Sequence, residues 1–112
     1  DDNKEIISKG TQTVALKAIP DSYALHNNFP NPFNPITNIF YDLPESGHTR
    51  MVIYDLLGRE VTTLINATME SGYHATRWNG RNQYGQPVGA GIYFYHLQTG
   101  SYSNAQKMLL VK

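Results

Sequence analysis

The stretch that decides the fold is Trp78-Asn79-Gly80-Arg81-Asn82-Gln83-Tyr84-Gly85-Gln86-Pro87-Val88-Gly89-Ala90-Gly91-Ile92-Tyr93-Phe94-Tyr95-His96-Leu97. Its first half is rich in glycine and contains Pro87, and such residues set special backbone angles or prevent regular pairing. Ile92–Leu97 is almost entirely β-branched or aromatic, which favours a packed strand. Gly91-Ile92-Tyr93 has the pattern of a tyrosine corner, in which the hydroxyl bonds back to upstream backbone. We therefore predict that Ile92–Leu97 is the central strand of a small β-sandwich.

Other segments outward from this stretch also show strand patterns and turn signals. In Thr49–Asp55 the alternation points Met51 and Ile53 inward. Asp55-Leu56-Leu57-Gly58-Arg59 predicts a tight hairpin, in which the Asp55 side chain accepts backbone N–H bonds and Gly58 takes a positive φ. The predicted strands are Thr37–Leu43, Thr49–Asp55, Val61–Ile65, Tyr73–Trp78, Ile92–Leu97 and Ala105–Val111. Six or seven short strands separated by turns indicate an all-β, antiparallel β-sandwich of about seven strands.

The N-terminal quarter of the chain is less regular. Residues 1–22 are mostly polar and are interpreted as a linker or tail from an upstream protein, although residues 13–16 allow a short first strand. Residues 23–112 form the predicted sandwich. Three prolines within residues 30–35 force an extended path. Phe29 and Phe33 are expected to tuck under the sheet, and a polyproline ligand for an aromatic groove is the alternative.

Composition excludes several classes of protein. The chain has 112 residues, enough for one domain with a real core. It contains no cysteine, which excludes disulfides and thiolate chemistry. No apolar run approaches the ~20 residues of a membrane span, so no membrane insertion is expected. The chain opens without methionine or a signal peptide, and we therefore expect it to be a fragment or a processed product.

Charge is unevenly distributed although the net charge is zero. Residues 1–70 hold all nine acidic and five basic side chains, a net −4, whereas residues 71–112 hold four basic and no acidic ones, a net +4. A basic C-terminal half suits an anionic partner such as a phosphate-bearing glycan, and chance spacing is the alternative. Nucleic-acid binding is not expected, because it needs a denser basic face.

No candidate catalytic or metal site emerges, and no cofactor is expected. Acidic side chains fall mostly at strand ends and hairpin tips, and no serine lies in a nucleophile elbow. The histidines lack paired ligand spacing, and packed or half-exposed histidines are the favoured interpretation. A metal held between His74 and His96 on neighbouring strands is the alternative. The loop of residues 79–89 lacks a carboxylate for calcium.

Aromatic side chains raise the question of sugar binding. Tyr73, Tyr84 and Tyr102 are the tyrosines expected to be exposed enough to stack on pyranose rings, although most aromatic residues lie in strand interiors. Asn66-Ala67-Thr68 matches a glycosylation acceptor, a short motif that also arises by chance.

Three stretches, in this order, resemble a known family. They are Phe29-Pro30-Asn31-Pro32-Phe33-Asn34-Pro35, then Ile53-Tyr54-Asp55-Leu56-Leu57-Gly58-Arg59-Glu60-Val61, then Gly91-Ile92-Tyr93 with the ending Lys107-Met108-Leu109-Leu110-Val111-Lys112. The combination resembles the type A C-terminal sorting domain of proteins exported by the type IX secretion system. The resemblance covers roughly residues 23–112.

The resemblance implies a fold, a role and a set of residues. The fold would be an immunoglobulin-like sandwich at the end of a larger exported cargo, secreted or displayed on the cell surface after passing through the periplasm. Outer-membrane secretion machinery would recognise it, and a sortase-like transpeptidase would cleave upstream within residues 1–22. The implied recognition residues are Gly91, Tyr93, Lys107, Met108, Leu109, Leu110, Val111 and Lys112. The structural signature positions are Asn31, Pro32, Phe33, Asn34, Asp55, Gly58, Arg59, Trp78 and Gly80.

One part of the chain is similar to a different protein. Trp78-Asn79-Gly80-Arg81-Asn82 and Gly85-Gln86-Pro87-Val88 look more like the immunoglobulin-like domain of the flagellar hook-capping protein. The alternative function is therefore an accessory spacer or carbohydrate-binding module of an extracellular enzyme. Physically, a C-terminal strand that ends in Lys112 is expected to be an exposed sheet edge, whose final six residues another protein pairs with by strand addition.

Overall fold

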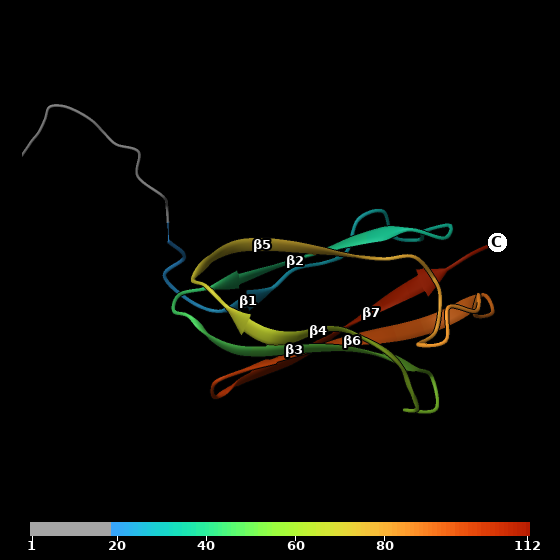
Figure 1. The fold of residues 1–112 in the computed structure, drawn as a ribbon. Coiled ribbons are helices and arrows are strands. Elements are labelled where there is room, and N and C mark those ends of the chain that lie inside the picture. Colours follow the sequence, from blue (N-terminus) through green and yellow to red (C-terminus); the bar gives the residue numbers. More distant parts are fainter. Residues whose placement is uncertain (1–18) are drawn as a thin grey trace, which may run out of the picture.

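The computed structural model describes residues 19–112, which form two packed antiparallel sheets and contain no helix (Figure 1). One sheet has the strand order β1-β2-β5 and the other β4-β3-β6-β7. The strands are β1 (Ala24–Leu25), β2 (Thr37–Leu43), β3 (Gly47–Asp55), β4 (Glu60–Met69), β5 (Gly72–Trp78), β6 (Gly91–Thr99) and β7 (Tyr102–Leu110). The predicted all-β, immunoglobulin-like sandwich is confirmed.

The positions of the strands agree with the alternation of apolar and polar residues, whereas their ends are set by hydrogen-bonded pairing with neighbouring strands. β2 has the predicted bounds, and β6 lies inside its sheet between β3 and β7. β4 extends four residues past the predicted end because its pairing with β3 continues to Gly47 opposite Met69. The short strand β1 was not predicted, because two residues are too few to show an alternation of apolar and polar side chains. The strand suggested at residues 13–16 lies outside the described residues.

The core lies between the two sheets and is built by period-two alternation. In β2 every second side chain is buried, from Thr37 to Leu43. Tyr93, Tyr95 and Leu97 of β6 face the same core. Burying one such side chain stabilises the fold by about 1.5–3 kcal/mol.

Strand β3 buries side chains on both of its faces. Met51 and Ile53 point into the core as predicted. Val52 is also buried, which the alternation did not predict, and it lies opposite His96 of β6. The outer face of this sheet therefore carries apolar side chains too.

The proline-rich segment is anchored by only one of its two phenylalanines. Phe33 is buried against Trp78, as predicted, with 5.8 Å between ring centroids. The prediction for Phe29 is wrong, because its side chain is 71% exposed. Phe29 forms an antiparallel bridge with Asn38, and opposite residues point to the same face of a sheet. Since Asn38 lies on the outer face of β2, Phe29 follows it outward.

The alternative of a facing His74–His96 pair is wrong, because β5 and β6 belong to different sheets. His74 on β5 stacks on Tyr41 with 5.1 Å between ring centroids and donates to the Glu70 carbonyl. His96 on β6 lies 2.7 Å from the Ser103 hydroxyl. Among residues 19–112 no group of three histidine or acidic side chains is placed to hold a metal ion.

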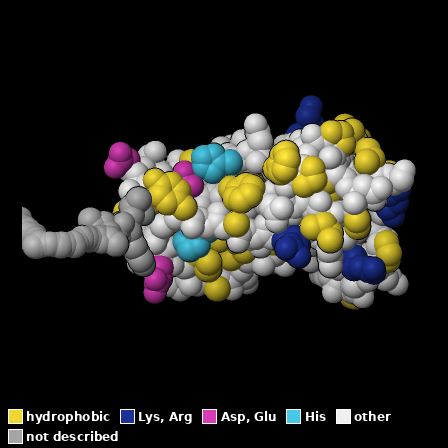
Figure 2. All heavy atoms as spheres, turned by 90° about the horizontal axis from the view of Figure 1, so that it is seen from above, with side chains coloured by type: hydrophobic (Ala, Val, Ile, Leu, Met, Phe, Trp, Pro, Cys, Tyr) yellow, Lys and Arg dark blue, Asp and Glu magenta, His cyan; other side chains and the backbone are white. Residues whose placement is uncertain are grey.

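Figure 2 looks onto the sheet formed by β1, β2 and β5. Acidic side chains on this face lie towards the end where the described chain begins, and basic ones lie towards the other end. Tyr73 and Tyr84 are exposed, as expected, whereas Tyr102 is half-buried because its ring stacks on Tyr23 at 5.2 Å. Within the described part of the chain, no helix has the length and apolarity to cross a bilayer.

Candidate recognition site at the last strand

Strand β7 is an edge strand, paired along its length only with β6. In an antiparallel strand, the N–H and C=O of alternate residues point towards the neighbour, and those between them point away. The Leu109 amide bonds away from β6, to a side chain of another segment. The outward-pointing backbone groups of β7 therefore belong to Leu109 and to every second residue before it.

The C-terminal part of this edge is already occupied by the chain itself. Leu109 N–H donates to Asn31 Oδ1 at 3.0 Å, and Phe33 N–H donates to the Leu109 carbonyl at 3.0 Å. Val111 N–H donates to the Phe33 carbonyl at 2.9 Å. Asn31 and Phe33 therefore cap the end of β7. The expectation of an open edge over all six last residues needs correction.

The edge before this cap is open to solvent. Alternation turns the backbone of Ser103, Ala105 and Lys107 outward, and all three residues are exposed. Ala105 N–H is taken up locally by Asn104 Oδ1 at 2.8 Å. In residues 19–112 the outward N–H and C=O of Lys107 have no partner. The part of β7 that a new strand can pair with is therefore Ser103–Lys107.

Side chains on β7 separate the expected recognition residues into two groups. Met108, opposite Tyr93, and Leu110, opposite Gly91, are each 1% exposed and belong to the core. The surface group consists of Lys107, Leu109, Val111 and Lys112. Of the expected recognition residues on the last strand, a partner that approaches the edge meets only the surface group.

Tyr93 makes the predicted tyrosine corner. Its hydroxyl donates to the Gly89 carbonyl at 2.6 Å, four residues upstream. Burial and then the nearby Asp55 carboxylate raise the pKa of Tyr93, so the hydroxyl keeps its proton. The ring packs edge-on against Trp78 at 5.2 Å between centroids. The corner therefore fixes the connection that enters β6.

Trp78 and Gly80 hold the cap against the sandwich. Trp78 packs on Phe33, and its Nε1–H donates to the Arg81 carbonyl at 2.9 Å. Gly80 has a φ of +73°, and a Cβ there would lie 3.1 Å from the Pro35 carbonyl oxygen. A larger residue at this position would be strained by the positive φ and would require Pro35, two residues after Phe33, to shift by a few tenths of an ångström. The remaining signature residues of this segment, Pro32 and Asn34, are exposed.

The β3–β4 hairpin forms as predicted. Asp55 Oδ1 accepts from Leu57 N–H at 3.0 Å and Arg59 N–H at 2.9 Å, and Arg59 Nε donates to Oδ2 at 2.8 Å. Gly58 takes a φ of +82°. The Arg59 backbone N–H is the largest cause that lowers the pKa of Asp55. Because Asp55 lies opposite Tyr93, the hairpin and the corner share one end of the domain.

We expect Asp55→Asn to lower the melting temperature at neutral pH, and the difference to vanish in acid. The Asp55 pKa is lowered below its ordinary 3.8 in the folded state, so its carboxylate stabilises the fold above that value. This stabilisation is lost as the pH falls through the folded-state pKa. Thermal melts of both proteins over a pH series measure it.

Glu60→Gln is the control for this prediction. Its carboxylate is exposed and lies 3.7 Å from Arg50, a surface pair of small expected effect. The hairpin interpretation is contradicted if the Asp55→Asn difference keeps its size in strong acid.

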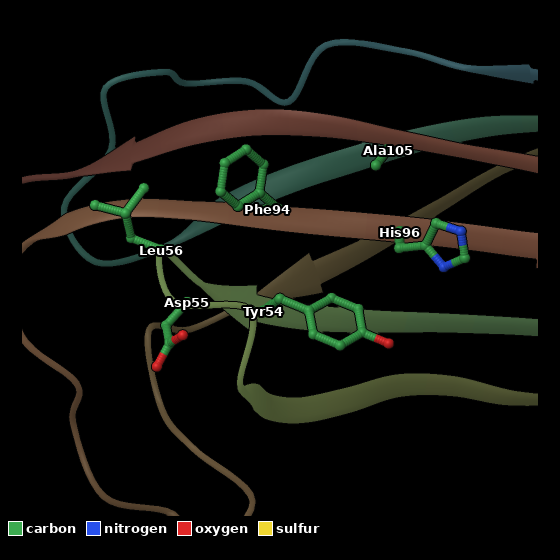
Figure 3. A pocket seen from close by; sticks show the side chains of 7 residues that line it. Tyr54, Asp55, Leu56, Phe94, His96 and Ala105 are labelled. Carbon is green, nitrogen blue, oxygen red and sulfur yellow. The ribbon is translucent and has the colours of Figure 1, made fainter.

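A hollow that was not predicted from the sequence lies on the outer face of the four-stranded sheet (Figure 3). It has a volume of about 410 Å³ and is lined by Tyr54, Asp55, Leu56, Gly58, Phe94, His96 and Ala105. The signal was present in β6, where the side chains on both faces are largely apolar. A strand that is apolar on both faces is typical of a sheet covered on both sides.

Comparison with known proteins identifies the family. The family model described as "Secretion system C-terminal sorting domain" matches residues 27–112. The chain belongs to this family. The match covers the cap, the hairpin, the corner and the last strand, and it confirms the expected sorting domain of type IX secretion. The family implies that the protein carrying this sorting domain is exported to the cell surface or outside.

Two solved structures share the fold of the sorting domain. One is dimeric latent PorU from Porphyromonas gingivalis, with a TM-score of 0.65 and 22% identity over 90% of this chain and 10% of that chain. The other is PorZ, described as an essential surface component of the type-IX secretion system of Porphyromonas gingivalis. It gives a TM-score of 0.54 and 20% identity over 82% of this chain and 12% of that chain.

The chain thus spans about a tenth of each of these structures. No curated protein sequence matches it. The similarity of residues 78–88 to the flagellar hook-capping domain stays a hypothesis.

Proposed function

We propose that the domain is a non-catalytic sorting signal, recognised by outer-membrane machinery of type IX secretion through β7. The observation that carries this proposal is the open edge at Ser103–Lys107 of β7, the last strand of a domain that belongs to a family of sorting domains. A strand of the machinery would add to this edge by main-chain hydrogen bonds. Each such bond contributes about 0.5–1.5 kcal/mol net, so a few give a reversible complex.

The sandwich prepares the edge for this role. Ladder pairing with β6 and the cap by Asn31 and Phe33 hold β7 in an extended conformation. A preformed strand loses little conformational entropy when another strand pairs with it. The fold therefore acts as a rigid frame that presents one short edge.

The two ends of the described chain suit a signal carried by a larger cargo. The described chain begins at one end of the sandwich and finishes at the other (Figure 1). The cargo joined upstream would then lie away from the C-terminal end of β7. A sortase-like transpeptidase would act on the segment before the fold, within residues 1–22, while the domain itself performs no chemistry.

Lys107→Pro tests the proposal, because proline removes the outward N–H without removing a bond to β6. We expect the full chain carrying this change, fused behind a reporter in a competent host, to lose export while it keeps its melting temperature. Lys107→Ala is the matched control, since it also loses the amine but keeps the N–H. We expect it to retain most export, because the backbone groups that pair with an added strand are unchanged.

Two outcomes would count against recognition by strand addition. Equal export of the proline and alanine variants would mean that the secretion machinery does not bind the backbone of β7. If the Lys107→Pro chain stays folded and the reporter is still exported normally, the accessory spacer is favoured as the function.

A further inference from the structure

The hollow on the outer face adjoins the open edge of β7. Its walls come from β3, from β6 and from the β3–β4 hairpin, and Ala105 of β7 forms its edge-side border (Figure 3). Tyr54 and His96 lie towards each other with 6.5 Å between ring centroids, in an edge-on arrangement. Phe94 and Leu56 line the other side, and the Leu56 side chain is 64% exposed. The hollow is therefore mainly apolar and open towards the edge strand.

Ala105 belongs to both the edge and the hollow. Its backbone points outward along the open part of β7, and its side chain borders the hollow. Cross-strand neighbours point to the same face with Cβ atoms about 4.5–5.5 Å apart. A strand added to β7 would therefore place one side chain beside Ala105, over the hollow. Because alanine is small, space for a large side chain is left there.

Lys107 is the charged side chain on the open part of β7. In residues 19–112 the Lys107 amine has no carboxylate within ion-pair distance, and residues 71–112 contain no acidic side chain. Lys107 lies next along the outward-pointing register from Ala105. An acidic side chain on an added strand would meet an unpaired cation there.

We propose that the strand recognised by β7 belongs to the secretion machinery, carries a large apolar side chain that fills the hollow beside Ala105, and has an acidic side chain facing Lys107. This inference rests on the proposed function and names the chemistry of the partner. Main-chain pairing alone is indifferent to sequence, whereas the hollow and Lys107 give the edge a side-chain preference. Partner choice is therefore set by the outer face of the sheet.

Leu56→Ser and Leu57→Ser form a matched pair for testing the hollow. Both side chains are exposed in the same hairpin, and only Leu56 lines the hollow. We expect Leu56→Ser to lower export of the fused reporter about tenfold, corresponding to ~1.4 kcal/mol of binding. Leu57→Ser should export normally. Thermal melts of both variants show whether folding is retained.

Ala105→Leu and Ala67→Leu form a second matched pair. Ala105→Leu places a larger side chain in the hollow, and Ala67→Leu is its control, because Ala67 does not line the hollow. Both alanines are exposed, and they lie on the two edge strands of the same sheet. We expect only Ala105→Leu to block export, because its side chain occupies the space of the partner's. For the charge, Lys107→Glu should export less than Lys107→Ala, because it places like charges opposite each other, and Lys107→Arg should export like the parent chain.

The outcomes separate this inference from the proposed function. If Lys107→Pro blocks export but Leu56→Ser and Ala105→Leu do not, recognition by the edge stands and the filled hollow is wrong. A second copy of the chain is the competing occupant. Sedimentation of the full chain tests it: a dimer that Ala105→Leu dissociates would overturn the proposal, and a monomer at all concentrations supports it.

Discussion

Deleting Lys107–Lys112 is expected to unfold the sandwich as a whole. The deletion removes Met108 and Leu110, each 1% exposed in the core, and it leaves Phe33 without its bridge to Leu110. Truncating one buried Met or Leu side chain costs about 2–5 kcal/mol. Two such losses approach the 5–15 kcal/mol that is typical of a whole domain. Circular dichroism and thermal melts of the deleted chain should show no cooperative transition.

A shorter truncation separates the signal from the fold. Removing only Val111 and Lys112 keeps both core side chains and loses the hydrogen bond from Val111 N–H to the Phe33 carbonyl. We expect this chain to stay folded and to lose about 1 kcal/mol. Its export then reports on the surface residues alone. A six-residue deletion that still melts cooperatively near the full-length temperature would show that the core does not depend on Met108 and Leu110.

Features encoded by neighbouring residues were predictable from the sequence. The bounds of β2 follow from alternation, the Asp55 hairpin from turn chemistry, and the Tyr93 corner from a residue four positions upstream. Each of these depends on contacts within a few residues. Local preferences and the global fold agree there, and such agreement marks a foldable sequence.

Features set by register between distant segments were not predictable. The outward turn of Phe29 depends on its bridge to Asn38, and the cap on Leu109 depends on Asn31. The separation of His74 from His96 depends on which sheet each strand joins. A one-residue slip in register reverses the face of every side chain, and nothing local fixes it.

The candidate site divides in the same way. The strand pattern of residues 105–111 was readable, and its position at the edge of a sheet was expected on physical grounds. The hollow beside Ala105 combines residues from three strands and a hairpin, so no single sequence motif predicts it. The apolar outer face of β6 was the one available signal. It predicts a covered face without saying which residues form the border.

Trp78→Ala is expected to be the most damaging single substitution, at a cost of about 3–5 kcal/mol. Trp78 is 1% exposed and joins the cap to the corner, through Phe33 on one side and Tyr93 on the other. Its loss leaves a cavity where the two sheets meet the end of β7. Denaturant unfolding of the variant and the parent measures the cost.

The cavity should also release the cap. Phe33 would lose its packing partner, and its hydrogen bonds with Leu109 and Val111 would open more often. We expect the amides that donate in these bonds, those of Phe33 and Val111, to exchange hydrogen faster in Trp78→Ala than in the control Tyr84→Ala, which is 77% exposed. Tyr84→Ala should change stability by less than about 0.5 kcal/mol. Equal exchange at Phe33 and Val111 in both variants would show that Trp78 stabilises the core without holding the cap, and that the end of β7 is positioned by Asn31 instead.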